Sequence, residues 1–393
     1  MRGRQTQGYE STVVSSIVST IARIKSFFVA LLAFKVKALT GRQAIIMVER
    51  VLEIGGYAAG YCGRLFARAG ADVVRIQMDS VGPAWASDEA MSAFLHGGKR
   101  LLSTADGQLI AELANAADIL IVEAQTANAL SAMDFDGFST PVKLAMTPFG
   151  RTGPKCNWNA SGNVMLAMGG YTHLMGDPDR APLSLPGHYL EFQTAALGYT
   201  AINACRMAGQ HKVIDLGMFE TLLALSQFTS VRWQCAGEQR ERHGSDFWYV
   251  VPSNLFVCAD GWVYLNIVPS FWDPLTVFLE RPELLLDSRF LTNDLRMENR
   301  EALHAIVGEI LAPLSKAEIF ARAQACRIPL GVVQSFAEVL DDPHLQARSF
   351  FAHSNARDVQ PWRIPENPYC INGERRTVGL GPITSEQVPL WRA

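Results

Sequence analysis

A glycine-rich turn between a strand and a helix is the first place where this sequence could bring a ligand close to its backbone. Residues 50–54 are largely apolar, Gly55 and Gly56 follow, and residues 58–69 have helical spacing. Glycine permits close approach of the backbone, and the first N–H groups of a helix attract anions. The turn therefore predicts either a ligand-binding helix end or close packing of the helix on a sheet.

Common signatures of nucleotide, hydrolytic and metal sites are missing. No Gly-x-Gly-x-x-Gly follows the first strand, Gly98-Lys-Arg100 lacks the upstream glycine of a P-loop, and no Gly-x-Ser-x-Gly or His-Glu-x-x-His occurs. The eight histidines are dispersed, and the seven cysteines form no Cys-x-x-Cys pair. These patterns argue against a metal site and a disulfide framework, and they favour a reducing, cytoplasmic compartment.

Composition excludes several broad classes of protein. The 393 residues are 49% apolar and 19% charged, with a formal net charge of −3. A disordered or fibrous chain is excluded, and the nearly neutral balance carries no nucleic-acid signal. A chain of this length favours two domains.

The first 46 residues differ from the rest of the chain. They hold seven basic residues and one acid, Glu10, and their longest uncharged apolar run, 27–34, is too short to span a membrane. We expect a basic extension, poorly ordered or helical. An upstream extension before Met47 is favoured, and a transit peptide or a membrane-surface helix is the alternative.

The elements that must position any site alternate between strands and helices. Apolar strands are expected at 50–54, 72–76, 118–122, 143–147 and 212–216, with helices at 58–69, 108–117, 192–207 and 218–236. This alternation predicts an α/β fold with a parallel sheet covered on both faces. A hairpin is expected at 254–267, helices at 301–311 and from Ser315, where Ser315 and Glu318 have capping-box spacing. We therefore expect a large domain at 47–240, a small α+β domain at 241–344, and a C-terminal return to the large domain at 345–393.

Three stretches in order resemble the family III CoA-transferases, the CaiB/BaiF, formyl-CoA transferase-like family. They are 50–76, which ends in Gly-Ala-Asp-Val-Val-Arg-Ile; 146–180, which contains Thr-Pro-Phe-Gly-Arg-Thr-Gly-Pro and Gly-Asp-Pro; and 331–348. The resemblance covers nearly all of residues 47–380. It implies a Rossmann-like large domain, a smaller domain and an interlocked homodimer. It also implies acyl-CoA and carboxylic acids as substrates, with no permanently bound cofactor.

The resemblance places the catalytic residue at Glu191. Family members carry an aspartate at the start of the long helix after Gly-Asp-Pro; it attacks the acyl-CoA thioester to form an anhydride and then an enzyme-bound thioester. This chain has glutamate there. The extra methylene moves the carboxylate by roughly 1.5 Å, and a misplacement of about 1 Å can cost on the order of 100-fold in rate. The alternative is an ordinary glutamate favoured by the helix dipole.

The resemblance also suggests residues that contact coenzyme A. Lys99 and Arg100 match a Lys-Arg pair of the family and could bind CoA phosphates; the alternative is an exposed, solvated pair. Four further candidates lie in the matching stretches: Arg75, Ala58, Phe149 and Gly150. An aromatic group could line an acyl pocket or belong to a core or interface: Phe247, Trp248, Tyr249 and Trp272.

Two rival functions follow from departures from the family pattern. Racemases of the superfamily use a His and an Asp at positions that here are Ser161 and Gly162, so proton transfer at this place is not expected. Fewer matching CoA residues favour the second rival, a non-catalytic acyl-CoA-binding or partner subunit. His188 could act as a base, although a histidine before a helix is more often structural.

Overall fold

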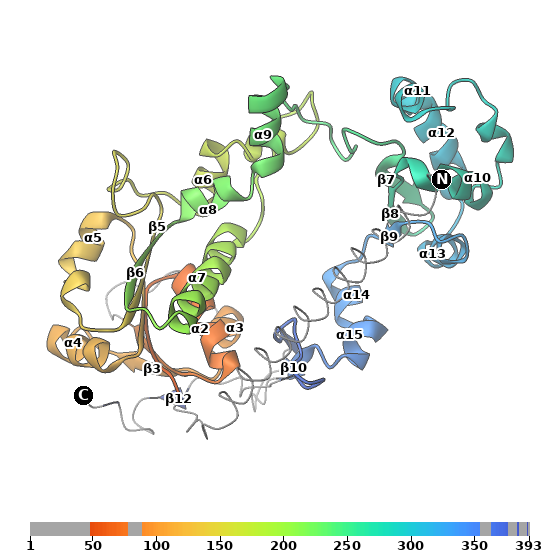
Figure 1. Cartoon of the computed structure of the whole chain (residues 1–393). Helices are drawn as coiled ribbons and strands as arrows, with labels where there is room; N and C mark the ends of the chain where they lie inside the picture. Colours follow the sequence, from red (N-terminus) through yellow and green to blue (C-terminus); the bar gives the residue numbers. More distant parts are fainter. Residues whose placement is uncertain (1–47, 78–88, 354–362, 376–382, 385–390, 392–393) are drawn as a thin grey trace, which may run out of the picture. The chain divides into compact units, whose positions relative to one another are not determined.

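The computed structural model describes residues 48–77, 89–353, 363–375, 383–384 and 391 (Figure 1). The expected N-terminal extension, residues 1–46, lies outside these ranges. Among the described residues, no helix is both long and apolar enough to cross a membrane.

A seven-stranded parallel sheet forms the framework of the protein. Its order is β12-β3-β2-β1-β4-β5-β6. The strands are β1 (Arg50–Ile54), β2 (Asp72–Gln77), β3 (Arg100–Ser103), β4 (Ile119–Glu123), β5 (Val142–Thr147), β6 (Lys212–Gly217) and β12 (Ile383–Thr384). The predicted α/β class and parallel sheet are thus confirmed.

Both faces of the sheet are buried, which explains why its central strands are almost continuously apolar. Val51 and Ile121 point into one core, whereas Leu52 and Val122 point into the other. The first core is completed by α2 (Tyr57–Ala69), α6 (Gly162–Met168), α7 (Tyr189–Met207) and α8 (Met218–Ala224), and the second by α4 (Gly107–Ala116) and α5 (Ala127–Ala132). Figure 1 shows α2 and α7 on one side of the sheet and α4 and α5 on the other.

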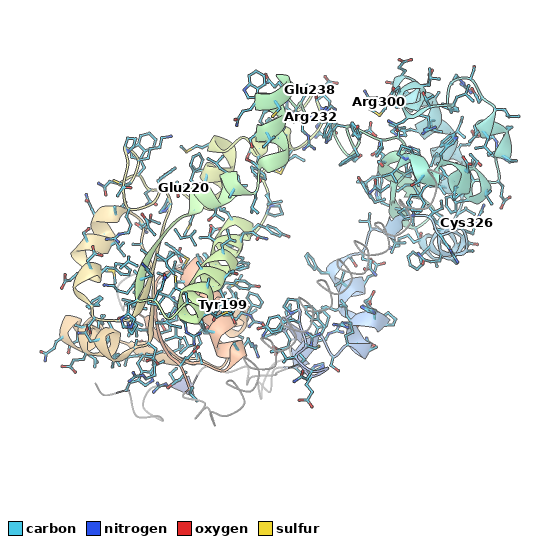
Figure 2. The ribbon with its side chains drawn as sticks, viewed as in Figure 1. Tyr199, Glu220, Arg232, Glu238, Arg300 and Cys326 are labelled. Carbon is cyan, nitrogen blue, oxygen red and sulfur yellow. The ribbon has the colours of Figure 1, made fainter. Side chains whose placement is uncertain are left out.

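Helices α2 and α7 pack against each other as well as against the sheet. On α7, Tyr199 meets the ring of Phe66 on α2 edge-on, with ring centroids 4.6 Å apart (Figure 2). Gly198 lets α7 approach β5, because a methyl group on it would lie 2.7 Å from Leu144. The packing fixes α7, and with it the position of Glu191 in its first turn.

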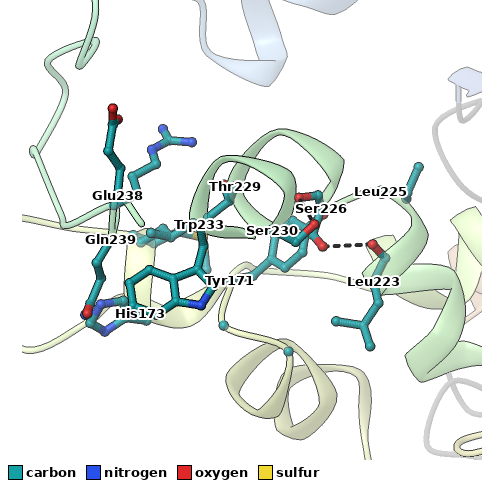
Figure 3. Close-up of a pocket in the computed structure, with 15 residues that line it drawn as sticks. Tyr171, His173, Leu223, Leu225, Ser226, Thr229, Ser230, Trp233, Glu238 and Gln239 are labelled. Atoms are coloured by element: carbon teal, nitrogen blue, oxygen red, sulfur yellow. Dashed lines mark hydrogen bonds between the residues drawn. The ribbon is translucent and has the colours of Figure 1, made fainter. Parts of the chain in front are cut away.

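The helix expected at 218–236 is instead two helices, so that prediction was wrong in this detail. α8 ends at Ala224, and α9 (Gln227–Ala236) begins after Ser226. The Ser226 hydroxyl donates to the carbonyl of Leu223 at 2.8 Å (Figure 3). Serine competes in this way with the helical ladder, which accounts for a break at this residue.

A further hydrophobic core, the small core, lies among residues 251–332. Its antiparallel sheet has the order β7-β8-β9, and the predicted hairpin and the capping box of Ser315 are both confirmed. The elements are β7 (Ser253–Cys258), β8 (Gly261–Asn266), β9 (Leu330–Val332), α10 (Trp272–Phe278), α11 (Asn293–Glu298), α12 (Arg300–Leu311) and α13 (Lys316–Ala325).

The segment that follows returns to the large sheet. β12 pairs with β3, and the indole of Trp391 donates to Asp72 at 2.7 Å. The remaining elements are α3 (Glu89–His96), α14 (Phe336–Leu340), α15 (Pro343–Ala347), β10 (Phe351–His353), β11 (Arg363–Pro365) and the short 3-10 turns Phe135–Gly137, Thr172–Leu174, Pro269–Phe271 and Pro282–Leu285.

Candidate active site

The sheet order reverses between β1 and β4, and the site is built at the carboxyl end of these strands. In open α/β sheets, ligands bind where neighbouring strands send their connections to opposite faces. β1 leads through Gly55 and Gly56 into α2, and β4 ends at Glu123. The two strands are direct neighbours, so the glycine turn and Glu123 lie side by side.

Glu123 occupies the N-terminus of α2. Its Oε2 accepts a hydrogen bond from the N–H of Ala59 at 2.9 Å. A methyl group on Gly55 would lie 2.6 Å from Cβ of Glu123, and one on Gly56 would lie 2.9 Å from Oε1. Close packing at the glycine turn is therefore confirmed, and the group at this helix end is a carboxyl group of the protein itself.

Glu191 stands in the first turn of α7 with 14% of its side chain exposed. Its carboxylate faces the start of α6, where a methyl group on Gly162 would lie 2.8 Å from Oε1 and 2.9 Å from Oε2. An acidic side chain in the first turn of a helix is stabilised by the helix dipole. The carboxylate is thus held at a helix end and still reaches solvent.

His188 precedes α7 and lies beside Glu191. Its Nδ1 is 3.8 Å from Oε1 of Glu191, and its ring stacks on Tyr57 of α2, with centroids 3.6 Å apart and planes 18° apart. Stacking between the first turns of α2 and α7 holds the ring in place. This arrangement supports the structural interpretation of His188, because the ring links two helices.

Glu123 and Glu191 influence each other electrostatically. Burial raises the pKa of Glu123 above its ordinary value, and the negative charge of Glu191 raises it further. The N–H of Ala59 opposes these effects and is outweighed. The site therefore combines one partly exposed carboxylate with a second carboxyl group that holds its proton to higher pH.

Arg75 and Lys99 lie beneath the site, in ion pairs with Glu53. The Lys99 ammonium is 2.5 Å from Oε2 of Glu53 and donates to the carbonyl of Gly60 at 2.7 Å. Arg75 binds the other oxygen of Glu53 and donates to the carbonyl of Gly55 at 2.7 Å. A contact with CoA phosphates would require these pairs to open, so that role stays a prediction without support from this geometry.

Arg100 is buried as well. Its guanidinium holds Asp72 with two hydrogen bonds, of 2.8 and 2.5 Å, and lies over the ring of Trp391. Neither Lys99 nor Arg100 is solvated, because their exposed fractions are 0% and 3%. The alternative of an exposed pair was therefore wrong. Lys99 forms an ion pair with Glu53, and Arg100 forms one with Asp72.

The remaining predicted CoA residues lie at the same edge of the sheet. Ala58 is wholly buried in the first turn of α2. Phe149 and Gly150 follow β5; the ring of Phe149 packs on Phe219, and Gly150 has a positive φ of 78°. The structure thus brings Ala58 close to Glu123 through Ala59, and a role of these residues in binding CoA stays a prediction.

A cavity of about 640 Å³ lies beside α9 (Figure 3). Tyr171, Leu223 and Trp233 give it an apolar wall, and His173 and Arg240 bring polar groups to it. None of the predicted site residues lines it.

Three of the aromatic residues proposed for an acyl pocket stay together: the ring centroids of Phe247 and Trp248 are 6.2 Å apart, and those of Trp248 and Tyr249 are 5.5 Å apart. Trp272 belongs to the small core among residues 251–332, whereas Phe247 and Tyr249 are exposed. Trp248 lines a smaller cavity of about 140 Å³, where Arg232 lies over its ring.

Across the described ranges, no three His, Cys, Asp or Glu side chains come together as ligands of a metal ion would. All seven cysteines are free, and burial raises the pKa of the Cys62 thiol far above its ordinary value. Cys62 is therefore a core residue and no thiolate nucleophile.

Two residues of the site were not chosen from the sequence, namely Glu123 and Gly162. A charged residue directly after the apolar strand at 118–122 was the available signal for Glu123. Gly162 was noted only as a position without a titratable side chain, and its contact with Glu191 depends on how α6 meets α7.

The fold and site define an α/β protein with a carboxylate held at a helix end, at the edge of a parallel sheet. Residues 49–382 match the model of CoA-transferase family III. The chain belongs to this family.

Relatives of known activity are similar over most of their length. The chain is 28% identical over 324 residues to the succinyl-CoA–D-citramalate CoA-transferase of Chloroflexus aurantiacus, a match that covers 76% of this chain and 81% of the relative. It is 26% identical over 336 residues to the succinyl-CoA:mesaconate CoA-transferase of Haloarcula marismortui, with 77% and 84% covered.

Solved structures share the fold. A CAIB/BAIF family protein from Brucella suis is similar with a TM-score of 0.74 at 21% identity, covering 84% of this chain and 93% of that one. A protein from M. tuberculosis gives the same TM-score of 0.74 at 20% identity, with 86% and 95% covered.

Proposed function

We propose that this protein transfers coenzyme A from an acyl-CoA donor to a carboxylic acid, with Glu191 as the nucleophile. The observation that carries the proposal is the position of the Glu191 carboxylate, in the first turn of α7 and partly exposed, in a chain of this family. A partly exposed carboxylate at a helix end is accessible to a bound thioester, as covalent catalysis requires.

The reaction balances without a proton or a metal ion. Glu191 attacks the thioester carbonyl, which forms an anhydride and releases the CoA thiolate. The thiolate attacks the glutamyl carbonyl, forms an enzyme thioester and releases the donor acid. The acceptor carboxylate then attacks this thioester, and the thiolate returns to the acceptor acyl group, which regenerates Glu191. Dividing the transfer into four exchanges lowers each barrier.

Short dicarboxylic acids are the substrate class that we propose to test first. The relatives described above are named for succinyl-CoA as donor and for citramalate or mesaconate as acceptor. Succinyl-CoA with each of these acids therefore forms the panel of choice.

The proposed assembly is a homodimer with interlocked chains. Exposed apolar side chains around α9 support association: Leu225 is 50% exposed, Val231 53% and Trp233 57%. Contiguous apolar surface is typical of protein contacts. Light scattering should give twice the chain mass of 43.2 kDa, and a single-chain mass would contradict the assembly.

Replacement of Glu191 tests the mechanism. Glu191→Gln removes the nucleophile and should abolish CoA transfer, and Glu191→Asp should lower kcat about 100-fold because its carboxylate is drawn back. With acyl-CoA present, hydroxylamine should modify the peptide that contains Glu191 in the native protein only, as read by mass spectrometry.

Glu301→Gln is the matched control, since Glu301 also lies in the first turn of a helix, α12, and is exposed. It should retain full activity. Equal transfer by Glu191→Gln would remove Glu191 from the mechanism. Binding of CoA without transfer by the native protein would favour the partner-subunit alternative.

A further inference from the structure

The Glu191 carboxylate lies directly against Gly162. Gly162 is the first residue of α6 and is buried. A methyl group on its Cα would lie 2.8 Å from Oε1, 2.9 Å from Oε2 and 3.1 Å from Cδ of Glu191. All three atoms of the carboxylate therefore occupy the space that a side chain at position 162 would fill.

Contacts this short do not persist in a packed protein, so a larger residue would force a movement. The carboxylate is the end of a flexible side chain, whereas Gly162 belongs to a helix that packs through Met165 and Leu166 into the first core. The carboxylate would move, and the backbone would stay. Space for the carboxylate is thus set by the residue opposite it.

We infer that Gly162 is a positioning residue for Glu191: because it has no side chain, it leaves the space that the Glu191 carboxylate occupies. The inference rests on the proposed function of Glu191. A glutamate carries its carboxylate one methylene farther from the backbone than an aspartate, and the absence of a side chain at position 162 accommodates that extra length. His188, with Nδ1 3.8 Å from Oε1, lies next to the same carboxylate and limits where it can move.

This geometry makes residues 162 and 191 a coupled pair. Glycine at 162 allows glutamate at 191, whereas a larger residue at 162 should suit the shorter aspartate. Residues in contact show coupling in double-mutant cycles, and distant residues do not. The pair therefore determines which acidic residue can act as the nucleophile.

A double-mutant cycle tests the inference in the full-length protein, with succinyl-CoA and a carboxylic acid that the native protein accepts. Gly162→Ala should lower kcat about 100-fold, because the carboxylate is displaced by about 1 Å, and should leave KM for the donor nearly unchanged. In the Glu191→Asp background, the same substitution should change kcat less than about 3-fold. Glutamyl thioester trapped by hydroxylamine should fall in parallel with kcat.

Gly107→Ala is the matched control. Gly107 is the first residue of α4, and a methyl group on it would have no heavy atom within 4 Å. It should leave kcat unchanged, and both alanine variants should keep the thermal midpoint of the native protein.

The outcomes separate the inference from the proposed function. If the native protein is active and Glu191→Gln is not, but Gly162→Ala retains native kcat, the inference alone is overturned. Equal losses from Gly162→Ala in both backgrounds would also overturn it, since they would show no coupling. If Glu191→Gln is as active as the native protein, the proposed function itself fails.

Discussion

Glu53 joins two buried cations beneath the candidate site. Its side chain is 0% exposed, and its two oxygens bind Arg75 and Lys99, whose side chains are 5% and 0% exposed. Burial is the main cause that lowers the pKa of Lys99, to about 8, and the charge of Glu53 opposes it. Without this carboxylate, the buried Lys99 ammonium would lose its ion-pair partner.

We therefore predict that Glu53→Gln lowers the free energy of unfolding by about 3–5 kcal/mol, the cost of breaking a buried ion pair by removing one partner. Urea denaturation followed by circular dichroism measures this change. Asp287→Asn is the control, because Asp287 pairs with Arg289 at the surface, where an ion pair contributes little. Equal shifts in both variants would contradict the assignment of Glu53 to the core.

The ion-pair partners of Lys99 and Arg100 could not be predicted from the sequence. Lys99 and Arg100 are adjacent basic residues, a pattern typical of a solvated or anion-binding surface. Their partners, Glu53 and Asp72, precede them by 46 and 28 residues. The registers of β1 and of β3 on β2 bring these charges together, and a single sequence does not contain those registers.

At the scale of elements, the Glu123 carboxyl group accepts a hydrogen bond from the first turn of α2, through the N–H of Ala59. Burial first, and then the charge of Glu191, raise the pKa of Glu123 above its ordinary value of 4.5. The folded chain therefore binds more protons than the unfolded chain between these two pKa values. By linkage, this group contributes stability that is full below pH 4.5 and is lost as the pH rises through the folded pKa.

We predict that Glu123→Gln, which resembles the protonated form of Glu123, removes this loss of stability at higher pH. The difference in urea midpoint between variant and native protein should increase, in favour of the variant, from pH 4.5 toward neutral. Glu112→Gln on α4, at an exposed position, is the control and should follow the native protein. Parallel profiles for Glu123→Gln and the native protein would show that Glu123 is already ionised when folded.

Elements with strong apolar patterns were predicted well. Strands β1, β2, β4, β5 and β6 agree with the apolar runs to within one residue at each end. In β1, β2, β4 and β5 the apolar run is continuous because both faces of these strands are buried. β3 was missed, since its four residues begin with Arg100 and only two of them are leucines. The break between α8 and α9 depends on one hydroxyl, that of Ser226, which periodicity does not reveal.

At the scale of the whole molecule, the buried side chains form separate cores. One pair of clusters covers the two faces of the large sheet, and another cluster lies among residues 251–330. The sequence predicted a boundary between residues 240 and 241, close to this division. We propose that the cores correspond to two domains, which the sequence places at 47–240 with 345–393 and at 241–344.

If the cores belong to two domains, a destabilising substitution in one core should leave the hydrogen-exchange protection of the other unchanged. Leu144 on β5 and Leu303 on α12 are both 0% exposed, and truncation of either to alanine should cost about 2–5 kcal/mol. In hydrogen exchange read by mass spectrometry, Leu303→Ala should speed exchange in β7, β8 and α12 and leave β1, β4 and β5 protected; Leu144→Ala should do the reverse. Independent cores open independently, so equal acceleration of both regions in either variant would show one cooperative unit instead of two domains.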